Sequence, residues 1–164
     1  MNDSLTPITV STAETAILPL VKRFFQSQGM RSQAAKTDVV IIARKQQQSS
    51  SPIIAALRLC PLQHSWILRS MSVAKTHQRQ GIGQQMLLQI RPQLAAKKCY
   101  CFAYPHLQVF YQRAGFLLIE QDSATDDIRQ LYQQYRQAGK ALVLLQFNPA
   151  LTDSVAASTR EPLP

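Results

Sequence analysis

The sequence predicts an α/β fold built around a mixed, mostly antiparallel β-sheet. Residues 38–44, 53–60 and 66–73 are rich in β-branched and apolar residues and are joined by short connections, as is typical of an antiparallel meander. A helix-like segment then separates residues 66–73 from residues 99–104, and a strand–helix–strand order indicates a right-handed crossover with a parallel pair. With 164 residues, 46% of them hydrophobic and 16% charged, the chain is long enough for one globular domain with a buried core.

The segment before the meander predicts one short strand and one helix. Residues 8–10 are expected to form the strand. Residues 11–14 (STAE) have the spacing of a capping box, so a helix is expected from Thr12, with an apolar face over residues 17–24. Pro19 interrupts this pattern, and we expect it either to kink the helix or to restart it.

The second half of the chain alternates between helices and strands. A helix is expected from Met86 to about Lys98, and Pro92 should bend it or end it early near Ile90. The further expected elements are helices at 106–114 and 126–138 and strands at 116–120 and 141–147.

The composition of the C-terminal segment predicts where the domain ends. Residues 149–164 contain prolines, Ser and Thr with little apolar content, so a loose tail is expected after a single domain over residues 1–148. No stretch approaches the length of a membrane span, and the start lacks a charged segment followed by an apolar one. We therefore expect no membrane association and a cytoplasmic protein.

The net charge of +9 indicates an anionic partner. Nucleic acid, a membrane surface, a phosphorylated small molecule and a merely solvated basic surface are all compatible with it. The aromatic residues mostly occupy strand positions or apolar helix faces, which argues against a nucleic-acid partner, since such proteins expose aromatic side chains between basic ones.

The three cysteines do not indicate a disulfide framework or a metal site. Cys99 and Cys101 share a strand face and could hardly bridge each other, and a single C-x-C pair is a weak zinc signal. No metal is expected. Cys101 could lie near a cofactor, although a small buried residue is the simpler interpretation.

Residues 78–83 (QRQGIG) predict a phosphate-binding turn. Two of the five glycines of the chain stand here, between a strand-like and a helix-like segment. Small residues let the backbone approach a phosphate, and the N–H groups and dipole at a helix start attract an anion. An ordinary glycine-containing helix entry is the alternative.

This turn resembles the acetyl-CoA-binding motif of the GNAT acetyltransferase superfamily, Arg/Gln-x-x-Gly-x-Gly/Ala, filled here by Gln78, Gly81 and Gly83. Residues 110–116 (FYQRAGF) resemble a second signature of that family, Phe-Tyr-x-x-x-Gly-Phe. The resemblance spans roughly residues 53–120. A dinucleotide-binding motif is excluded, because there is no third glycine and no acidic residue about twenty positions later.

The resemblance implies a fold and an activity. The implied fold is a mixed, mostly antiparallel sheet of six to seven strands with helices on both faces, whose central parallel strands, residues 66–73 and 99–104, splay apart. The implied reaction moves an acetyl group from acetyl-CoA to a primary amine by direct attack within a ternary complex. The partners are acetyl-CoA and an unidentified amine acceptor, and a homodimer is compatible with the resemblance.

The resemblance also assigns roles to individual residues. Tyr111 matches the tyrosine that protonates the departing CoA thiolate; packing beside Phe110 and Phe116 is the alternative. Lys75 would add positive charge near the phosphates. The residues expected to bind the cofactor are Met71, Ser72 and Val73, which would pair with the pantetheine arm, and Gln78, Arg79, Gln80, Gly81, Ile82, Gly83 and Gln84 around the pyrophosphate.

Departures from the family pattern leave the acceptor chemistry open. Many relatives carry a Glu base on the strand before the turn, but residues 65–73 contain no Asp or Glu. His64, Glu120 and Asp122 are candidate bases by residue type alone. A catalytically silent acyl-CoA sensor is therefore a second hypothesis.

Four side chains have two interpretations each. Arg69 would bind an acidic substrate group or face the surface. His106 would approach the cofactor or remain at the surface. Tyr132 and Tyr135 would line an acceptor pocket or pack in the core. The acceptor itself could be a small amine, an amino acid, an antibiotic or a protein amine.

Overall fold

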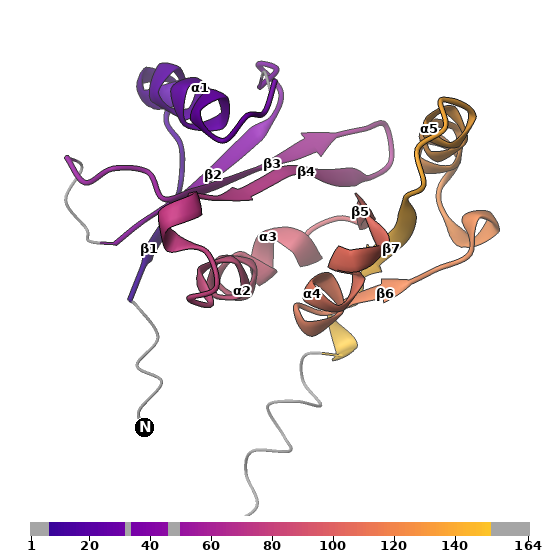
Figure 1. Ribbon diagram of the computed structural model, residues 1–164. Coiled ribbons are helices and arrows are strands. Elements are labelled where there is room, and N and C mark those ends of the chain that lie inside the picture. Colours follow the sequence, from indigo (N-terminus) through magenta and orange to yellow (C-terminus); the bar gives the residue numbers. More distant parts are fainter. Residues whose placement is uncertain (1–6, 32–33, 46–49, 152–164) are drawn as a thin grey trace, which may run out of the picture. The chain divides into compact units, whose positions relative to one another are not determined.

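The computed structural model describes residues 7–31, 34–45 and 50–151, which fall into two units (Figure 1). The first unit comprises Met1–Leu62 and Trp66–Ile90, and the second comprises Gln63–Ser65 and Arg91–Pro164. The single domain expected over residues 1–148 stays a prediction. Of the expected tail, residues 152–164 lie outside the described residues.

The first unit contains the expected antiparallel meander. Its strands lie in the order β1-β2-β3-β4, and each neighbouring pair is antiparallel. The strands are β1 (Thr9–Thr12), β2 (Val39–Arg44), β3 (Ala55–Pro61) and β4 (Trp66–Val73). The β-branched and apolar runs therefore form strands within two residues of the positions that the sequence predicts.

The capping box predicted for the first helix is wrong. Helix α1 (Leu18–Ser27) begins six residues after Thr12 and follows a 3-10 turn, η1 (Thr15–Ile17). Ser11 and Thr12 belong to β1, opposite Ile42 and Ile41 of β2, so extended pairing takes the residues that would have capped the helix. Pro19 stands in the first turn of α1, where its missing N–H costs nothing. Of the two predicted effects of this proline, a restart is the one observed.

Helices cover both faces of the strands in the first unit. On one face, Val21, Phe24 and Phe25 of α1 pack with Val40 and Ile42 of β2 and with Ala56 of β3. Figure 1 shows α1 above strands β2–β4 and α2 (Ile82–Gln89) below them. Because side chains alternate along a strand, Ile41, Leu57 and Leu59 are buried towards the face opposite α1.

The helix after the glycines ends early, as Pro92 predicts. Helix α2 ends at Gln89 with Ile90 as its C-cap, and α3 (Arg91–Ala95) begins as a separate short helix. A continuous helix to Lys98 is therefore wrong, and the expected early end near Ile90 is confirmed.

The described residues of the second unit contain three strands and three α-helices. The strands lie in the order β5-β7-β6, and both pairs are antiparallel. The strands are β5 (Cys99–Ala103), β6 (Phe116–Leu118) and β7 (Val143–Phe147), and the helices are α3, α4 (Gln108–Arg113) and α5 (Asp126–Gln137). The second unit also has the 3-10 turns η3 (Pro105–Leu107) and η4 (Gln121–Ser123), and the first unit has the 3-10 turn η2 (Lys75–His77).

The described residues thus contain seven strands, mostly antiparallel, together with helices, which confirms the predicted fold class. The expected parallel pair joins strands that belong to different units and stays a prediction. Within the described ranges, no helix is long and apolar enough to cross a membrane.

Asp127 ties the short segment Gln63–Ser65 to the start of α5 in the second unit. Its Oδ2 accepts hydrogen bonds from the His64 N–H and from the Ser65 hydroxyl, both at 3.1 Å, and its Oδ1 accepts one from the Ile128 N–H at 2.9 Å. Burial alone would raise the pKa of Asp127, but the hydrogen bonds to the carboxylate outweigh burial and lower the pKa below 3.8.

We expect Asp127→Asn to lower the free energy of unfolding at neutral pH by about 1 kcal/mol, because a neutral amide replaces a charged acceptor. A carboxyl with a depressed folded pKa stabilises the protein above its unfolded pKa, and this contribution is lost as the pH falls through the folded pKa. The difference between wild type and variant should therefore shrink below pH 3.8 in thermal unfolding experiments.

Asp126→Asn is the matched control. The Asp126 side chain is 84% exposed and forms an ion pair with Arg129 at 3.1 Å, so its loss should change stability less. Equal effects of the two variants at neutral pH would contradict a specific role for Asp127.

Candidate active site

The chain between β4 and α2 adopts a strained turn. After η2, Arg79 has φ +61° and Gly81 has φ +73°, both in the left-handed region. Gly81 is the N-cap of α2 and adopts this conformation readily, whereas for Arg79 it is uncommon. Strain of this kind persists where the surrounding structure enforces it, and it is concentrated at ligand-binding sites.

The turn offers hydrogen-bond donors to an anion. The first turn of α2 leaves the N–H groups of Ile82 and Gly83 without acceptors in the helix, because its first intrahelical bond runs from Gln85 N to Gly81 O at 3.0 Å. The helix dipole adds positive potential at the same place. Residues 74–85 contain no acidic residue, and the side chains of Lys75 and Arg79 are exposed. These features fit the pyrophosphate of a coenzyme A.

Hydrogen bonds within the first unit hold the turn in place. Ala74 N–H donates to Ile54 O at 2.8 Å, and Lys75 N–H donates to the Gln28 side-chain oxygen at 3.2 Å. The Gln78 amide nitrogen donates to Val73 O at 3.0 Å.

A β-bulge interrupts β4 just before the segment expected to pair with the pantetheine arm. Arg58 pairs with Arg69 and Ala56 with Ser72, so two residues of β4 stand opposite one residue of β3. Ser70 lies in this interval with φ +56°. Bulges of this kind redirect side chains and are frequent beside active sites. Because no glycine marks the position, sequence reasoning missed it.

Tyr111 is buried in the second unit. It lies on α4, 6% exposed, with its ring 5.0 Å from that of Phe110 and 5.7 Å from that of Phe116, both edge-to-face. Burial raises the pKa of Tyr111 well above 10.0, and a hydrogen bond with the Cys101 side chain raises it further. The phenol keeps its proton at neutral pH, as an ordinary phenol also does, and the raised pKa makes it a weaker acid.

Cys101 is also buried, as its second interpretation predicts. Burial raises the pKa of its thiol to about 12. The group beside the Tyr111 hydroxyl is therefore a neutral thiol, not a thiolate.

Several candidates of the second unit lie at its surface or pack in its core. His64, Glu120 and Asp122 are exposed. His106 is exposed and stacks on Tyr104 with ring centres 5.9 Å apart.

Tyr132 and Tyr135 of α5 follow the packing interpretation. Both rings lie against Phe102, at 5.3 and 5.6 Å, and the Tyr132 hydroxyl donates to Leu142 O at 2.7 Å.

Arg69 lines a basic pocket in the first unit that sequence reasoning missed. This open pocket has a volume of about 800 Å³ and lies between α1 and the β3–β4 pair. The sequence contains one indication of this pocket: like Arg69 in β4, Arg58 is a charged residue in the mostly apolar strand β3. The lining residues are Lys22, Gln26, Gly29, Met30, Arg31, Arg58 and Arg69, called the basic pocket below.

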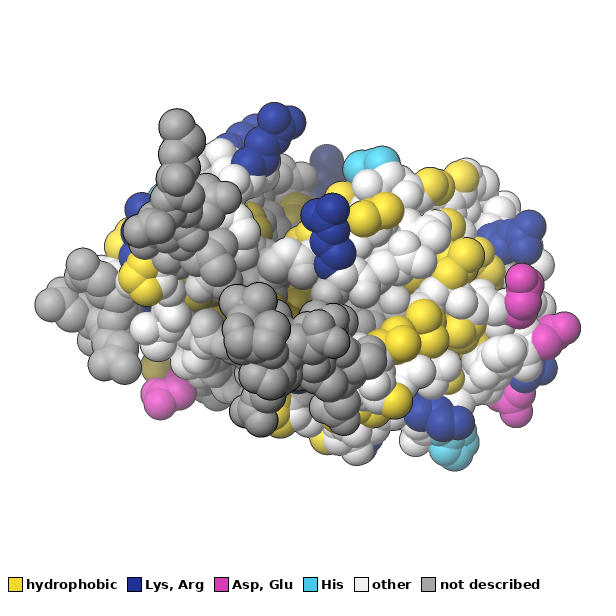
Figure 2. Space-filling view, turned by 90° about the horizontal axis from the view of Figure 1, so that it is seen from below, with side chains coloured by type: hydrophobic (Ala, Val, Ile, Leu, Met, Phe, Trp, Pro, Cys, Tyr) yellow, Lys and Arg dark blue, Asp and Glu magenta, His cyan; other side chains and the backbone are white. Residues whose placement is uncertain are grey.

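Neither a metal site nor a basic stripe is visible in the described part of the chain. There, no three His, Cys, Asp or Glu side chains lie close enough to hold a metal ion. On the face drawn in Figure 2, the Lys and Arg side chains among the described residues form small groups separated by uncharged atoms. The expected absence of metal and of a nucleic-acid partner both stay predictions.

Comparison with known families identifies the class of protein. The family model described as an acetyltransferase (GNAT) domain matches residues 36–117, which are 82 of the 164 residues and thus half of the chain. No curated protein matches the sequence.

Solved structures share the fold at low sequence identity. N-acetylglutamate synthase from Neisseria gonorrhoeae, complexed with coenzyme A and N-acetyl-glutamate, is 15% identical with a TM-score of 0.61, over 85% of this chain and 34% of its own. The ribosomal-protein-S18-alanine N-acetyltransferase from Escherichia coli is 15% identical with a TM-score of 0.57, over 85% and 92%. A GNAT-family acetyltransferase from Staphylococcus aureus Mu50 is 12% identical with a TM-score of 0.56, over 87% and 99%.

This chain spans about a third of the length of the synthase. At these identities the structures establish the fold alone. The family model carries the assignment further: it covers half of the chain, and the chain belongs to the GNAT acetyltransferase family.

We expect Gly81→Ala to weaken acetyl-CoA binding and to cost roughly 1–2 kcal/mol of stability, because a Cβ disfavours the left-handed conformation that the turn requires. A change in φ at this N-cap would rotate the N–H groups that we expect to face the phosphates. Titration with acetyl-CoA and thermal unfolding measure the two effects.

Gly139→Ala separates strain from ligand binding. Gly139 has φ +78°, and a Cβ built there meets nothing within 4 Å, so this control should lose similar stability without losing affinity for acetyl-CoA. Equal affinity of the two variants would exclude the turn from the cofactor site.

Proposed function

We propose that this chain is an acetyl-CoA-dependent N-acetyltransferase that acetylates a primary amine by direct attack in a ternary complex. The observation that carries the proposal is the left-handed turn at Arg79 and Gly81, at the start of α2 and inside the region matched by the acetyltransferase domain. Its donors and charge suit a diphosphate, which coenzyme A carries.

The proposed donor site uses two adjacent segments of the first unit. Gln78, Arg79, Gln80, Gly81, Ile82, Gly83 and Gln84 would surround the pyrophosphate. Backbone groups of Met71, Ser72 and Val73 would pair with the amides of the pantetheine arm. The bulge at Ser70 supports this role, because it shifts the register of β4 just before the segment, while Ser72 and Val73 stay paired with Ala56 and Ala55 of β3.

The proposed reaction needs positioning and proton transfer. The amine nitrogen attacks the thioester carbonyl, a C–N bond forms, and the C–S bond breaks as the sulfur leaves with the electron pair. Tyr111 would protonate that sulfur, and a base or water would take the proton lost by the amine. Holding both substrates in attack geometry supplies much of the rate gain. His64, Glu120 and Asp122 stay candidate bases.

A catalytically silent acyl-CoA-binding protein is the second candidate. The burial of Tyr111 between two phenyl rings and its hydrogen bond with Cys101 favour a structural role for this residue. The missing acid on β4 points the same way. In this case acetyl-CoA would bind without being consumed.

The fold leaves the acceptor undetermined. The related structures include a synthase solved with N-acetyl-glutamate and an enzyme named for the alanine of a ribosomal protein, and these two molecules differ greatly in size. A cytoplasmic location and a homodimer likewise stay predictions.

Two measurements test the proposal. Acetyl-CoA should raise the melting temperature of the protein, and free CoA should appear when amines of different classes are added. No rise in melting temperature would exclude the donor site. A rise without release of CoA with any amine would favour the silent alternative.

We expect Tyr111→Phe to lower kcat about 100-fold while changing the KM for acetyl-CoA little, because it removes a general acid and keeps the ring. Steady-state CoA release measures both parameters. An unchanged kcat would limit Tyr111 to packing.

Tyr132→Phe is the matched control. It removes a hydroxyl that donates to Leu142 O at 2.7 Å, so we expect a loss of about 1 kcal/mol in stability with kcat unchanged.

A further inference from the structure

The basic pocket carries an excess of positive charge that the proposed donor site does not use. Four of its lining residues are cationic, namely Lys22 and Arg31 from α1 and the segment after it, Arg58 from β3 and Arg69 from β4. Among the described residues that line the pocket, none is acidic. With Asp38, which contacts Arg58, the five side chains have a net charge of four minus one, or +3.

The two arginines at the floor of the pocket are direct cross-strand neighbours. Arg58 and Arg69 stand opposite each other in the β3–β4 pair. Like charges in this arrangement repel, and one carboxylate, that of Asp38, lies against Arg58 at 2.7 Å.

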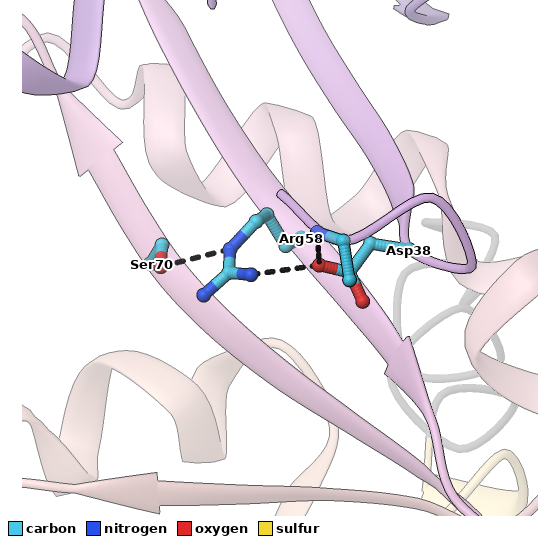
Figure 3. Close-up of polar contacts among 4 residues, drawn as sticks. Asp38, Arg58 and Ser70 are labelled. Atoms are coloured by element: carbon cyan, nitrogen blue, oxygen red, sulfur yellow. Dashed lines mark hydrogen bonds and ion pairs between the residues drawn. The ribbon is translucent and has the colours of Figure 1, made fainter. Parts of the chain in front are cut away.

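The contacts of Arg58 make the site rigid (Figure 3). Its Nη1 donates to Asp38 Oδ2, and its Nε donates to Ser70 Oγ at 3.2 Å. Asp38 Oδ2 also accepts the Ala35 N–H at 2.9 Å. The side chains of Arg58 and Asp38 are 12% and 4% exposed, so this guanidinium is fixed before a ligand arrives. A guanidinium held in this way presents a fixed positive charge, which suits a carboxylate.

The pocket lies next to the segment proposed for the pantetheine arm. Arg69 precedes Met71 by two residues, which corresponds to about 7 Å along a strand. An acceptor whose anion lies at Arg69 could place an amine several ångströms away near the thioester. A volume of about 800 Å³ is in the usual range for sites of small molecules.

We propose that the basic pocket binds the carboxylate of the acceptor, so that the substrates are small amines that also carry a carboxylate group. The inference rests on the proposed acetyltransferase function for the reaction, but binding of the anion can be measured without it. Lys22 and Arg31, which are exposed, lie at the rim and attract the anion, and Arg58 and Arg69 hold it.

Matched acceptors test the substrate class. CoA release is compared for 4-aminobutyrate against n-butylamine and for β-alanine against n-propylamine, with 2-aminoethyl phosphate as a phosphate arm. We expect kcat/KM to be at least about tenfold higher for the carboxylates, the factor that one good charged contact supplies. Equal values within each pair overturn the inference, and so does a preference for the phosphate compound.

Arg69→Gln tests the site. We expect the KM for the preferred amino carboxylate to rise about tenfold or more, with the KM for acetyl-CoA unchanged and with partial rescue in Arg69→Lys. Arg23→Gln is the control, because Arg23 is an exposed cation of α1 outside the pocket. If Arg69→Gln and Arg23→Gln raise the KM for the amino carboxylate equally, the cause is the lower net charge of the protein, and the assignment is overturned.

A binding measurement separates this inference from the proposed function. Calorimetric titration of the full chain with 4-aminobutyrate and L-glutamate, without acetyl-CoA, should give binding that Arg69→Gln removes and Arg23→Gln keeps. If the protein binds these compounds but never releases CoA, the pocket assignment stands and the acetyltransferase function fails. If CoA is released only with amines that lack a carboxylate, and neither 4-aminobutyrate nor L-glutamate binds, the acetyltransferase function stands and the pocket assignment fails.

Discussion

One extra residue in β4 organises the first unit. The bulge at Ser70 divides the strand into two halves with different tasks. Before it, Arg69 stays in register with Arg58 and lines the basic pocket, and after it Met71–Val73 leads into the phosphate turn. Ser70 also accepts a hydrogen bond from Arg58, so the irregular backbone is tied to the ion pair beneath the pocket. A regular strand would carry the side chains on its two halves in one continuous alternation and would lose this division.

The turn after β4 is held by contacts that its own sequence does not contain. The left-handed backbone conformation of Arg79 is unfavourable in free energy, and contacts with the neighbouring structure offset this cost. The Gln28 side chain reaches the N–H of Lys75 from the end of α1, and Ile54 O accepts the N–H of Ala74. The conformation of the turn before α2 therefore depends on α1 and on the segment before β3. For this reason we expect changes far from residues 78–84 to affect binding of the proposed donor.

The proposed proton transfer and the proposed anion binding depend on two different effects of burial. Burial keeps the Tyr111 phenol neutral, because a phenolate would be poorly solvated among aromatic rings. Arg58 is also largely buried, yet it keeps a charged partner in Asp38, as a buried guanidinium requires. Burial thus favours the protonated form of Tyr111, whereas the buried ion pair fixes the positive charge of Arg58 beside the basic pocket.

The sequence by itself determined the element order and the class of protein, and it predicted the donor. Runs of β-branched residues, the position of Pro92 and the glycines near residue 81 act through local backbone preferences, so they can be read without neighbours. Tertiary structure decided the rest. Ser11 and Thr12 became strand because β2 offered hydrogen bonds that outweigh a helix cap, and the bulge at Ser70 has no local signal. The basic pocket joins residues from α1, β3 and β4, and a charge cluster of this kind exists only once β-sheet register and helix packing bring distant residues together.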